Sequence, residues 1–132
     1  MSEDKTAASD MTPHEQETKR VLIVYSRSTG CSYQTTARRV LDDYGVPYQE
    51  LFIDQDEAAR QRVLAWTGFL SVPTLVIAEP GEVVPCTDFK PLGPGRSPRG
   101  VDRGPMLTEA SYDQLIAWLR KHGFIEDFAA DS

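Results

Sequence analysis

The sequence is poor in the residues that build metal centres and disulfide frameworks. It has two cysteines and two histidines among 132 residues. Cys31 and Cys86 lie far apart, and neither His14 nor His122 stands at metal-ligand spacing from a cysteine or from the other histidine. The sequence therefore predicts neither a disulfide-stapled fold nor a resident metal ion.

A long apolar run, an apolar N-terminal segment and an excess of basic residues are also missing. No stretch approaches the roughly 18 apolar residues of a membrane helix, and the first residues do not resemble a signal peptide. A formal net charge of −6 and a pI near 4.8 argue against nucleic acid as the main partner. We expect a monomer without a membrane partner. Free cysteines are typical of reducing compartments, so we expect the cytoplasm.

Two segments have no clear periodicity. Residues 1–18 are mostly polar, and we predict a disordered N-terminal tail ahead of one folded domain, residues 19–128. Residues 90–105 are rich in proline and glycine, which predicts a mobile surface loop without regular structure. We interpret this loop as a solvated excursion rather than a binding lid.

Short apolar runs with β-branched residues predict strands over residues 21–25 and 74–78, and we predict a further strand over residues 48–53. The turn pair Pro80-Gly81 precedes a segment, residues 82–87, that we expect to pair back as a fourth, edge strand.

Apolar spacing predicts three helices. The first covers residues 31–44 and ends at Gly45. The second follows a cap at Asp54 or Asp56 and ends at Gly68. The third begins at Ser111, with Gln114 at the capping-box position, and ends at Gly123. Its predicted buried face is Tyr112, Leu115, Ile116 and Leu119.

The element order is strand, helix, strand, helix, strand, strand, helix. A crossover makes the first two strands parallel, and a tight turn would make the last two antiparallel. The result is an α/β domain with a mixed four-stranded sheet flanked by three helices, which is the topology of the thioredoxin fold.

Cys31 follows the first strand and a short turn, and it opens the first helix. Unpaired N–H groups and the positive end of the helix dipole lie there, and both favour the nucleophilic thiolate. A buried structural thiol is the alternative that this placement leaves open.

Pro73 lies in Ser71-Val72-Pro73-Thr74, just before the third strand. One helix, one strand and another helix separate it from Cys31, and that path returns the chain beside its starting strand. The Cys31 and Pro73 turns should therefore share one end of the sheet, where ligands bind in α/β folds.

Several short motifs, in this order, resemble those of the glutaredoxins. They are Tyr25-Ser26-Arg27, Cys31-Ser32-Tyr33-Gln34, Gly45-Val46-Pro47-Tyr48 with Ile53-Asp54, Thr67-Gly68 with Ser71-Val72-Pro73-Thr74, and Gly81 through Cys86-Thr87-Asp88. The resemblance covers roughly residues 20–89 and the last helix. It implies a thioredoxin fold, a cis Val72-Pro73 bond and a groove for glutathione or another low-molecular-weight thiol as co-substrate.

The resemblance also implies roles for individual residues. Cys31 would be the nucleophile, and the glutathione contacts would be Arg27, Tyr33, Gln34, Val72, Pro73, Thr87 and Asp88. Arg27 and Asp88 have a solvated turn as their alternative, and Tyr33 has a place in the core. Cys86 is either a packing residue or a secondary thiol.

Three departures from the family pattern matter. Gln34 stands where a second active-site cysteine is usual, and Arg27 is one step further than usual from Cys31. Val84-Pro85 replaces a Gly-Gly pair. Asp102, in a stretch similar to one in some glutaredoxin-like proteins, competes with Asp88 for the carboxylate role.

We therefore predict a monothiol, glutathione-dependent oxidoreductase that deglutathionylates proteins through Cys31. Its partners would be glutathionylated or disulfide-bearing proteins and small thiols. The alternative is a [2Fe–2S] cluster held between two chains with two glutathiones, as in monothiol relatives. A binding module that has lost turnover is a third interpretation.

Overall fold

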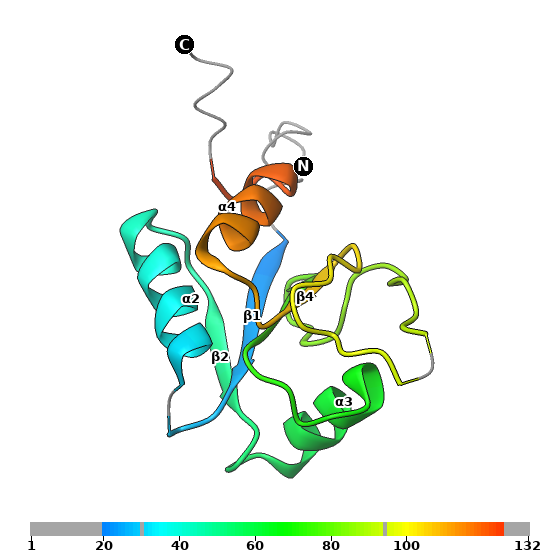
Figure 1. Ribbon diagram of the computed structural model, residues 1–132. Helices are drawn as coiled ribbons and strands as arrows, with labels where there is room; N and C mark the ends of the chain where they lie inside the picture. The colour runs from blue at the N-terminus through cyan, green and yellow to red at the C-terminus, as the bar shows by residue number, and fades with distance from the viewer. Residues whose placement is uncertain (1–19, 30, 94, 126–132) are drawn as a thin grey trace, which may run out of the picture.

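The computed structural model describes residues 20–29, 31–93 and 95–125. The predicted tail, residues 1–18, and the predicted domain end, residues 126–128, lie outside these residues. The described part forms one mixed sheet with helices on both faces (Figure 1). Its strands are β1 (Val21–Ser26), β2 (Gln49–Phe52), β3 (Thr74–Ala78) and β4 (Met106–Thr108). Its helices are α2 (Ser32–Asp43), α3 (Glu57–Thr67) and α4 (Tyr112–Lys121).

The strand order β2-β1-β3-β4 confirms the predicted thioredoxin fold. β1 runs parallel to β2, as the crossover through α2 requires. β3 runs antiparallel to β1, with Tyr25 opposite Thr74, and β4 runs antiparallel to β3, with Thr74 opposite Thr108. The end of β1, the start of β3 and the end of β4 therefore meet at one end of the sheet.

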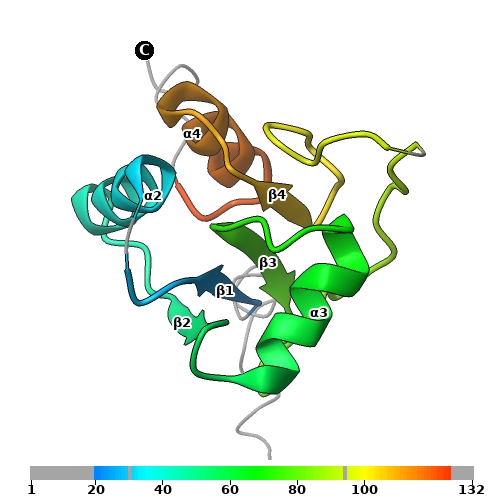
Figure 2. The ribbon, with the colours of Figure 1, turned by 60° about the horizontal axis from the view of Figure 1, so that its bottom comes forward.

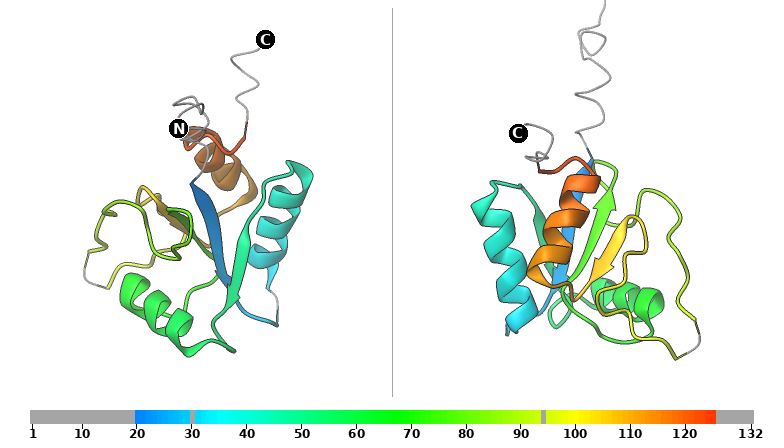
Figure 3. Two further views of the ribbon diagram at one scale, coloured as in Figure 1. Left: turned by 180° about the vertical axis from the view of Figure 1, so that it is seen from behind. Right: turned by 45° about the horizontal axis from the view of Figure 1, so that its top comes forward.

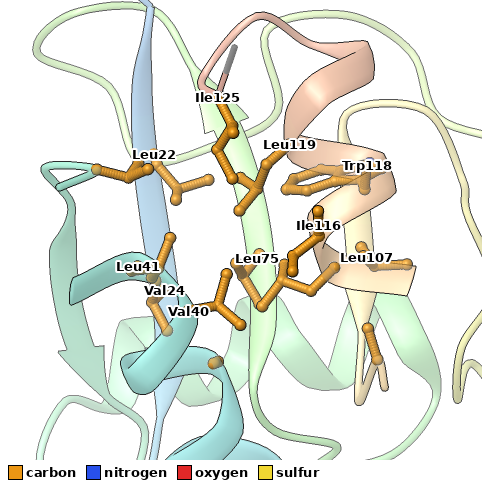
Figure 4. Packing of buried hydrophobic residues seen from close by; sticks show 14 of the residues in the cluster. Leu22, Val24, Val40, Leu41, Leu75, Leu107, Ile116, Trp118, Leu119 and Ile125 are labelled. Atoms are coloured by element: carbon orange, nitrogen blue, oxygen red, sulfur yellow. The ribbon is translucent and has the colours of Figure 1, made fainter. Parts of the chain in front are cut away.

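Two apolar clusters fill the two faces of the sheet. α2 and α4 cover one face, and α3 covers the other (Figures 2 and 3). Figure 4 shows how Leu22 and Leu75 from the sheet meet Val40 from α2 and Leu119 from α4. The alternation of side chains along each central strand supplies both clusters, so the strands are buried on both sides.

The predicted helix boundaries are largely confirmed. The Asp56 side chain caps α3 by accepting from the Ala59 N–H at 3.2 Å, and Gly68 ends that helix with a φ of 77°. Ser111 and Gln114 form the expected capping box of α4. One buried position was wrong, because Tyr112 is 44% exposed while Trp118 is buried in its place.

The prediction of a fourth strand over residues 82–87 is wrong. The Cys86 N–H donates to the Ile77 carbonyl at 2.8 Å, but Pro85 has no N–H to continue such a ladder. The edge of β3 is taken instead by Met106–Thr108, whose three residues are all buried. The connection between β3 and β4 is therefore the long segment 79–105 rather than a tight turn.

The Pro/Gly-rich loop has no helix or named strand in its described part, as predicted, but its second half is anchored. Arg103 is only 3% exposed. Its guanidinium donates to the Lys90 and Trp66 carbonyls at 2.7 Å each and stacks 4.8 Å from the Phe89 ring centroid. The interpretation as a solvated excursion is wrong here, because a buried arginine with these bonds fixes the chain.

Among the residues that the structure describes, none belongs to a helix long and apolar enough to cross a membrane.

Candidate active site

Cys31 is the N-cap residue of α2 and is exposed to solvent. This exposure removes the alternative of a buried structural thiol. Its side chain makes no capping hydrogen bond, and its Sγ lies 3.9 Å from the Val72 carbonyl oxygen. The thiol therefore lies at a helix start and is not sequestered by the core, a placement suited to nucleophilic chemistry.

The Val72-Pro73 turn lies beside Cys31, and its peptide bond is cis, which confirms the expectation from the resemblance. Hydrogen bonds hold this turn against β4. The Glu109 N–H donates to the Pro73 carbonyl at 2.9 Å, and the Thr74 and Thr108 hydroxyls lie 3.0 Å apart. The end of β4 is thus tied to the residues that face the thiol.

An open pocket of about 600 Å³ surrounds Cys31. Four chain segments line it: the turn after β1 and the start of α2, the turn before β3, the loop before β4, and the residue after β4. The lining residues are Arg27, Thr29, Cys31, Gln34, Phe69, Leu70, Ser71, Val72, Ser97, Pro98, Arg99 and Glu109. A space of this size accommodates a small organic ligand.

Gln34 is 1% exposed and is bonded to the main chain of Arg27. Its Oε1 accepts from the Arg27 N–H and its Nε2 donates to the Arg27 carbonyl, each at 2.8 Å. Gln34 does line the pocket, but its amide is used by these two bonds. It therefore acts by positioning Arg27, and the predicted direct ligand contact is not supported by this geometry.

Arg27 lines the pocket, and its guanidinium donates to the Leu70 carbonyl at 3.1 Å. The next residue, Ser28, is held by Asp54, which accepts from the Ser28 N–H at 3.1 Å. Hydrogen bonds from the Ser28 side chain and backbone lower the pKa of Asp54 below its usual value. The cation of Arg27 thus sits on a turn fixed from both sides by Gln34 and Asp54.

Tyr33 is half-buried on α2 and belongs to neither apolar cluster. The Arg99 guanidinium lies over its ring, 5.4 Å from the centroid. This contact places Tyr33 against the loop beside the pocket rather than in the core, and Tyr33 is not among the residues that line the pocket.

Two carboxylates proposed from the sequence lie outside the pocket. Thr87 and Asp88 are exposed, and they directly follow Cys86. The Cys86 N–H donates to the Ile77 carbonyl, near the end of β3 that lies away from the pocket. Asp102 pairs with Lys121 at 2.7 Å. Burial alone would raise the pKa of Asp102, but hydrogen bonds from Lys121 and Gly104 outweigh it and lower this pKa. These assignments came from the family resemblance alone, and the position of these residues outside the pocket lining does not support them.

The carboxylate that does line the pocket is Glu109, which sequence reasoning missed. It directly follows β4 and has a φ of 49°, the left-handed region that non-glycine residues seldom adopt. A signal for it existed in the sequence. The capping box at Ser111 predicts that a helix begins there. Because connections between elements are usually short, a strand that ends two or three residues before Ser111 could have been expected, and Glu109 would then directly follow it.

Cys86 is half-buried and packs against the cluster under α2 and α4. The Cys86 N–H donates to the carbonyl of Ile77, which lies three residues along β3 from Thr74. At about 3.3 Å per residue, Ile77 is roughly 10 Å further than Thr74 from the end of β3 that carries the site. A disulfide requires Cα atoms within about 7 Å. This separation argues against a secondary thiol and favours the alternative of a packing residue for Cys86, and both cysteines are free.

Comparisons with known proteins relate part of this chain to the glutaredoxins. Residues 22–82 match the family model described as Glutaredoxin. The chain is also similar to a solved structure, the "Crystal structure of buckwheat glutaredoxin-glutathione complex", at 29% identity and a TM-score of 0.38. That match covers 48% of this chain and 59% of the buckwheat chain, less than two thirds of its length. No curated protein matches the chain.

Proposed function

We propose that this chain, whose residues 22–82 match the glutaredoxin family model, is a glutathione-dependent thiol–disulfide oxidoreductase that acts through Cys31 alone. The observation that carries the proposal is the exposed Cys31 thiol at the start of α2, beside Val72 in a pocket with charged walls. A reducing compartment such as the cytoplasm belongs to this proposal, because both cysteines must remain thiols.

The proposed reaction begins when the Cys31 thiolate attacks the glutathione sulfur of a mixed disulfide. A new S–S bond joins Cys31 to glutathione, and the substrate sulfur leaves as a thiolate that takes a proton from water. A second glutathione thiolate then attacks the glutathione sulfur on Cys31. This step releases the Cys31 thiolate and oxidised glutathione, so one incoming glutathione is consumed for each substrate thiol that is released.

The residues around Cys31 support a single-thiol route. Gln34 occupies the place of a resolving cysteine and is bonded to Arg27. Cys86 packs at the other end of β3. With no second thiol within reach among the described residues, an external thiol must resolve the adduct.

The test is glutathione-dependent turnover of a glutathionylated peptide by the full chain. We expect turnover that Cys31→Ser abolishes and that the matched variant Cys86→Ser leaves unchanged. A wild-type chain without turnover, or a Cys31→Ser chain with full turnover, would refute the proposal. The absorbance spectrum of anaerobically purified protein addresses the cluster-binding alternative, since a [2Fe–2S] cluster absorbs visible light.

A further inference from the structure

We propose that Arg99, carried to the pocket by the Pro/Gly-rich loop, is a specificity-determining residue that binds the α-carboxylate of the γ-glutamyl end of the thiol ligand. This inference rests on the proposed glutathione chemistry. It assigns a ligand contact to a loop that the sequence analysis interpreted as a solvated excursion.

The backbone that directly follows Arg99 is fixed to β4 and α4. The Gly100 N–H donates to the Thr108 carbonyl at 2.7 Å, and the Gly100 carbonyl accepts from Gln114 at 3.1 Å. Arg99 itself forms an isolated bridge with Thr108. A residue held in this way has its position set before any ligand arrives, which lowers the entropic cost of binding.

The Arg99 side chain is held loosely by comparison. It is 61% exposed, its guanidinium lies over the Tyr33 ring, and its Nη2 lies 3.6 Å from a Glu109 carboxylate oxygen. Within the described residues, its side chain makes no hydrogen bond. Exposed ion pairs contribute little to stability. The planar donor fork is therefore available to a ligand carboxylate at little cost.

The charges of the pocket are arranged along the end of the sheet. Arg27 follows β1, Val72 precedes β3, and Glu109 follows β4, in the order of the strands across the sheet. One side of the Cys31–Val72 centre thus offers a lone cation. The other side offers the cation of Arg99 together with the anion of Glu109.

Glutathione carries a matching pattern. Its glycine end has a lone carboxylate, and its γ-glutamyl end has a carboxylate and an ammonium on one carbon. With the sulfur at Cys31, the lone carboxylate faces Arg27 and the amino-acid group faces Arg99 and Glu109. The reverse orientation would leave Glu109 without a cation from the ligand and would place an ammonium beside Arg27.

The experiment measures one chemical step, so it does not require turnover. The Cys31 thiolate attacks a symmetric disulfide, one half becomes joined to Cys31, and the other half leaves as a thiolate that is protonated by water. Mass spectrometry measures the rate at which this adduct on Cys31 forms. The probes are the disulfides of glutathione, of γ-glutamylcysteine, which lacks glycine, and of cysteinylglycine, which lacks the γ-glutamyl group.

We expect Arg99→Ala to lower the rate of adduct formation with the first two disulfides about tenfold relative to wild type, as the loss of a charge-assisted hydrogen bond implies. The rate with the cysteinylglycine disulfide should stay within about twofold. Arg27→Ala should give the opposite pattern, slowing the disulfides that carry a glycine carboxylate. Arg96→Ala, an exposed arginine on the same loop outside this pocket, should leave all three rates unchanged.

Equal slowing of all three probes by Arg99→Ala, or no slowing of any, would overturn the proposal. Equal slowing would mean that Arg99 acts through long-range charge or loop structure. Arg99→Gln, which keeps most of the side-chain stem, should repeat the selective loss if Arg99→Ala unfolds. A wild-type chain that forms the adduct selectively but does not turn over would refute the proposed enzyme function and leave the role of Arg99 standing.

Discussion

Replacing Gln34 tests whether a buried amide organises the pocket. In Gln34→Ala, the Arg27 N–H and carbonyl both lose a partner at 2.8 Å. Each neutral hydrogen bond contributes about 1 kcal/mol. Water can reach the exposed Arg27, so we add little for unsatisfied groups. The free energy of unfolding should fall by about 2 kcal/mol, which corresponds to a Tm lower by roughly 8 °C for a domain of this size.

Gln34→Glu separates bonding from shape, because it keeps the volume and one acceptor. Its carboxylate cannot donate to the Arg27 carbonyl, and it places a charge at a position that is 1% exposed. We expect a loss at least as large as that of Gln34→Ala. Gln34→Cys should also be destabilised. It would restore a pair of active-site thiols, but it would remove the two hydrogen bonds that fix the Arg27 turn.

Urea unfolding of the wild type and the three variants measures these free energies, with Gln61→Ala as the matched control. Gln61 bonds an exposed Glu57 within α3, and its removal should stay within about 0.5 kcal/mol. The rate of Cys31 adduct formation with oxidised glutathione should fall in Gln34→Ala, because Arg27 loses its fixed position. A Gln34→Ala chain as stable and as reactive as wild type would refute the reasoning.

Three further predictions follow from the described contacts. Arg103→Ala removes two charge-assisted bonds at 2.7 Å and the stacking on Phe89, so urea unfolding should detect a loss of about 3 kcal/mol; a loss below 1 kcal/mol would contradict the anchoring of the loop. Burial lowers the pKa of the His122 imidazole. As the pH decreases below about 6.5, the unfolded chain binds a proton at His122 more readily than the folded chain does, so the free energy of unfolding should decrease as the pH decreases. His122→Phe should flatten that decrease, measured as unfolding free energy against pH, and an unchanged slope would exclude His122 as its source. Gly100→Ala should lower the stability and slow the adduct with oxidised glutathione, because Gly100 has a φ of 69° and an added Cβ would lie 3.0 Å from Gln114; unchanged values of both would argue against a fixed Arg99.

The central part of the fold could be predicted from sequence because local signals and packing agree there. The apolar runs of β1 and β3, the cap at Asp56 and the capping box at Ser111 each indicate an element that the structure contains. β4 escaped prediction because three buried residues after a proline carry almost no periodic signal. The competing segment 82–87 had a turn and β-branched residues, yet Pro85 prevents a ladder.

The site was predictable where it depends on β1, α2 and the turn before β3. Cys31, Arg27 and the Val72-Pro73 turn do meet in one pocket. The wall contributed by Arg99 and Glu109 was not predictable, because its place depends on β4 and on a loop anchored by a buried arginine. Whether a glutamine contacts ligand or main chain also depends on geometry that spacing does not encode, as Gln34 illustrates.

The long segment between β3 and β4 divides the pocket into two parts that we expect to differ in local stability. β4 is a three-residue edge strand whose pairing must close that segment, whereas Cys31 and Val72 are carried by elements beside the centre of the sheet. Transient opening of β4 would withdraw Arg99 and Glu109 while the thiol remained in place. A ligand that binds both parts would then slow hydrogen exchange at the amides of β4 more than at those of β1, and the affinity for the ligand would depend on how rarely this edge opens.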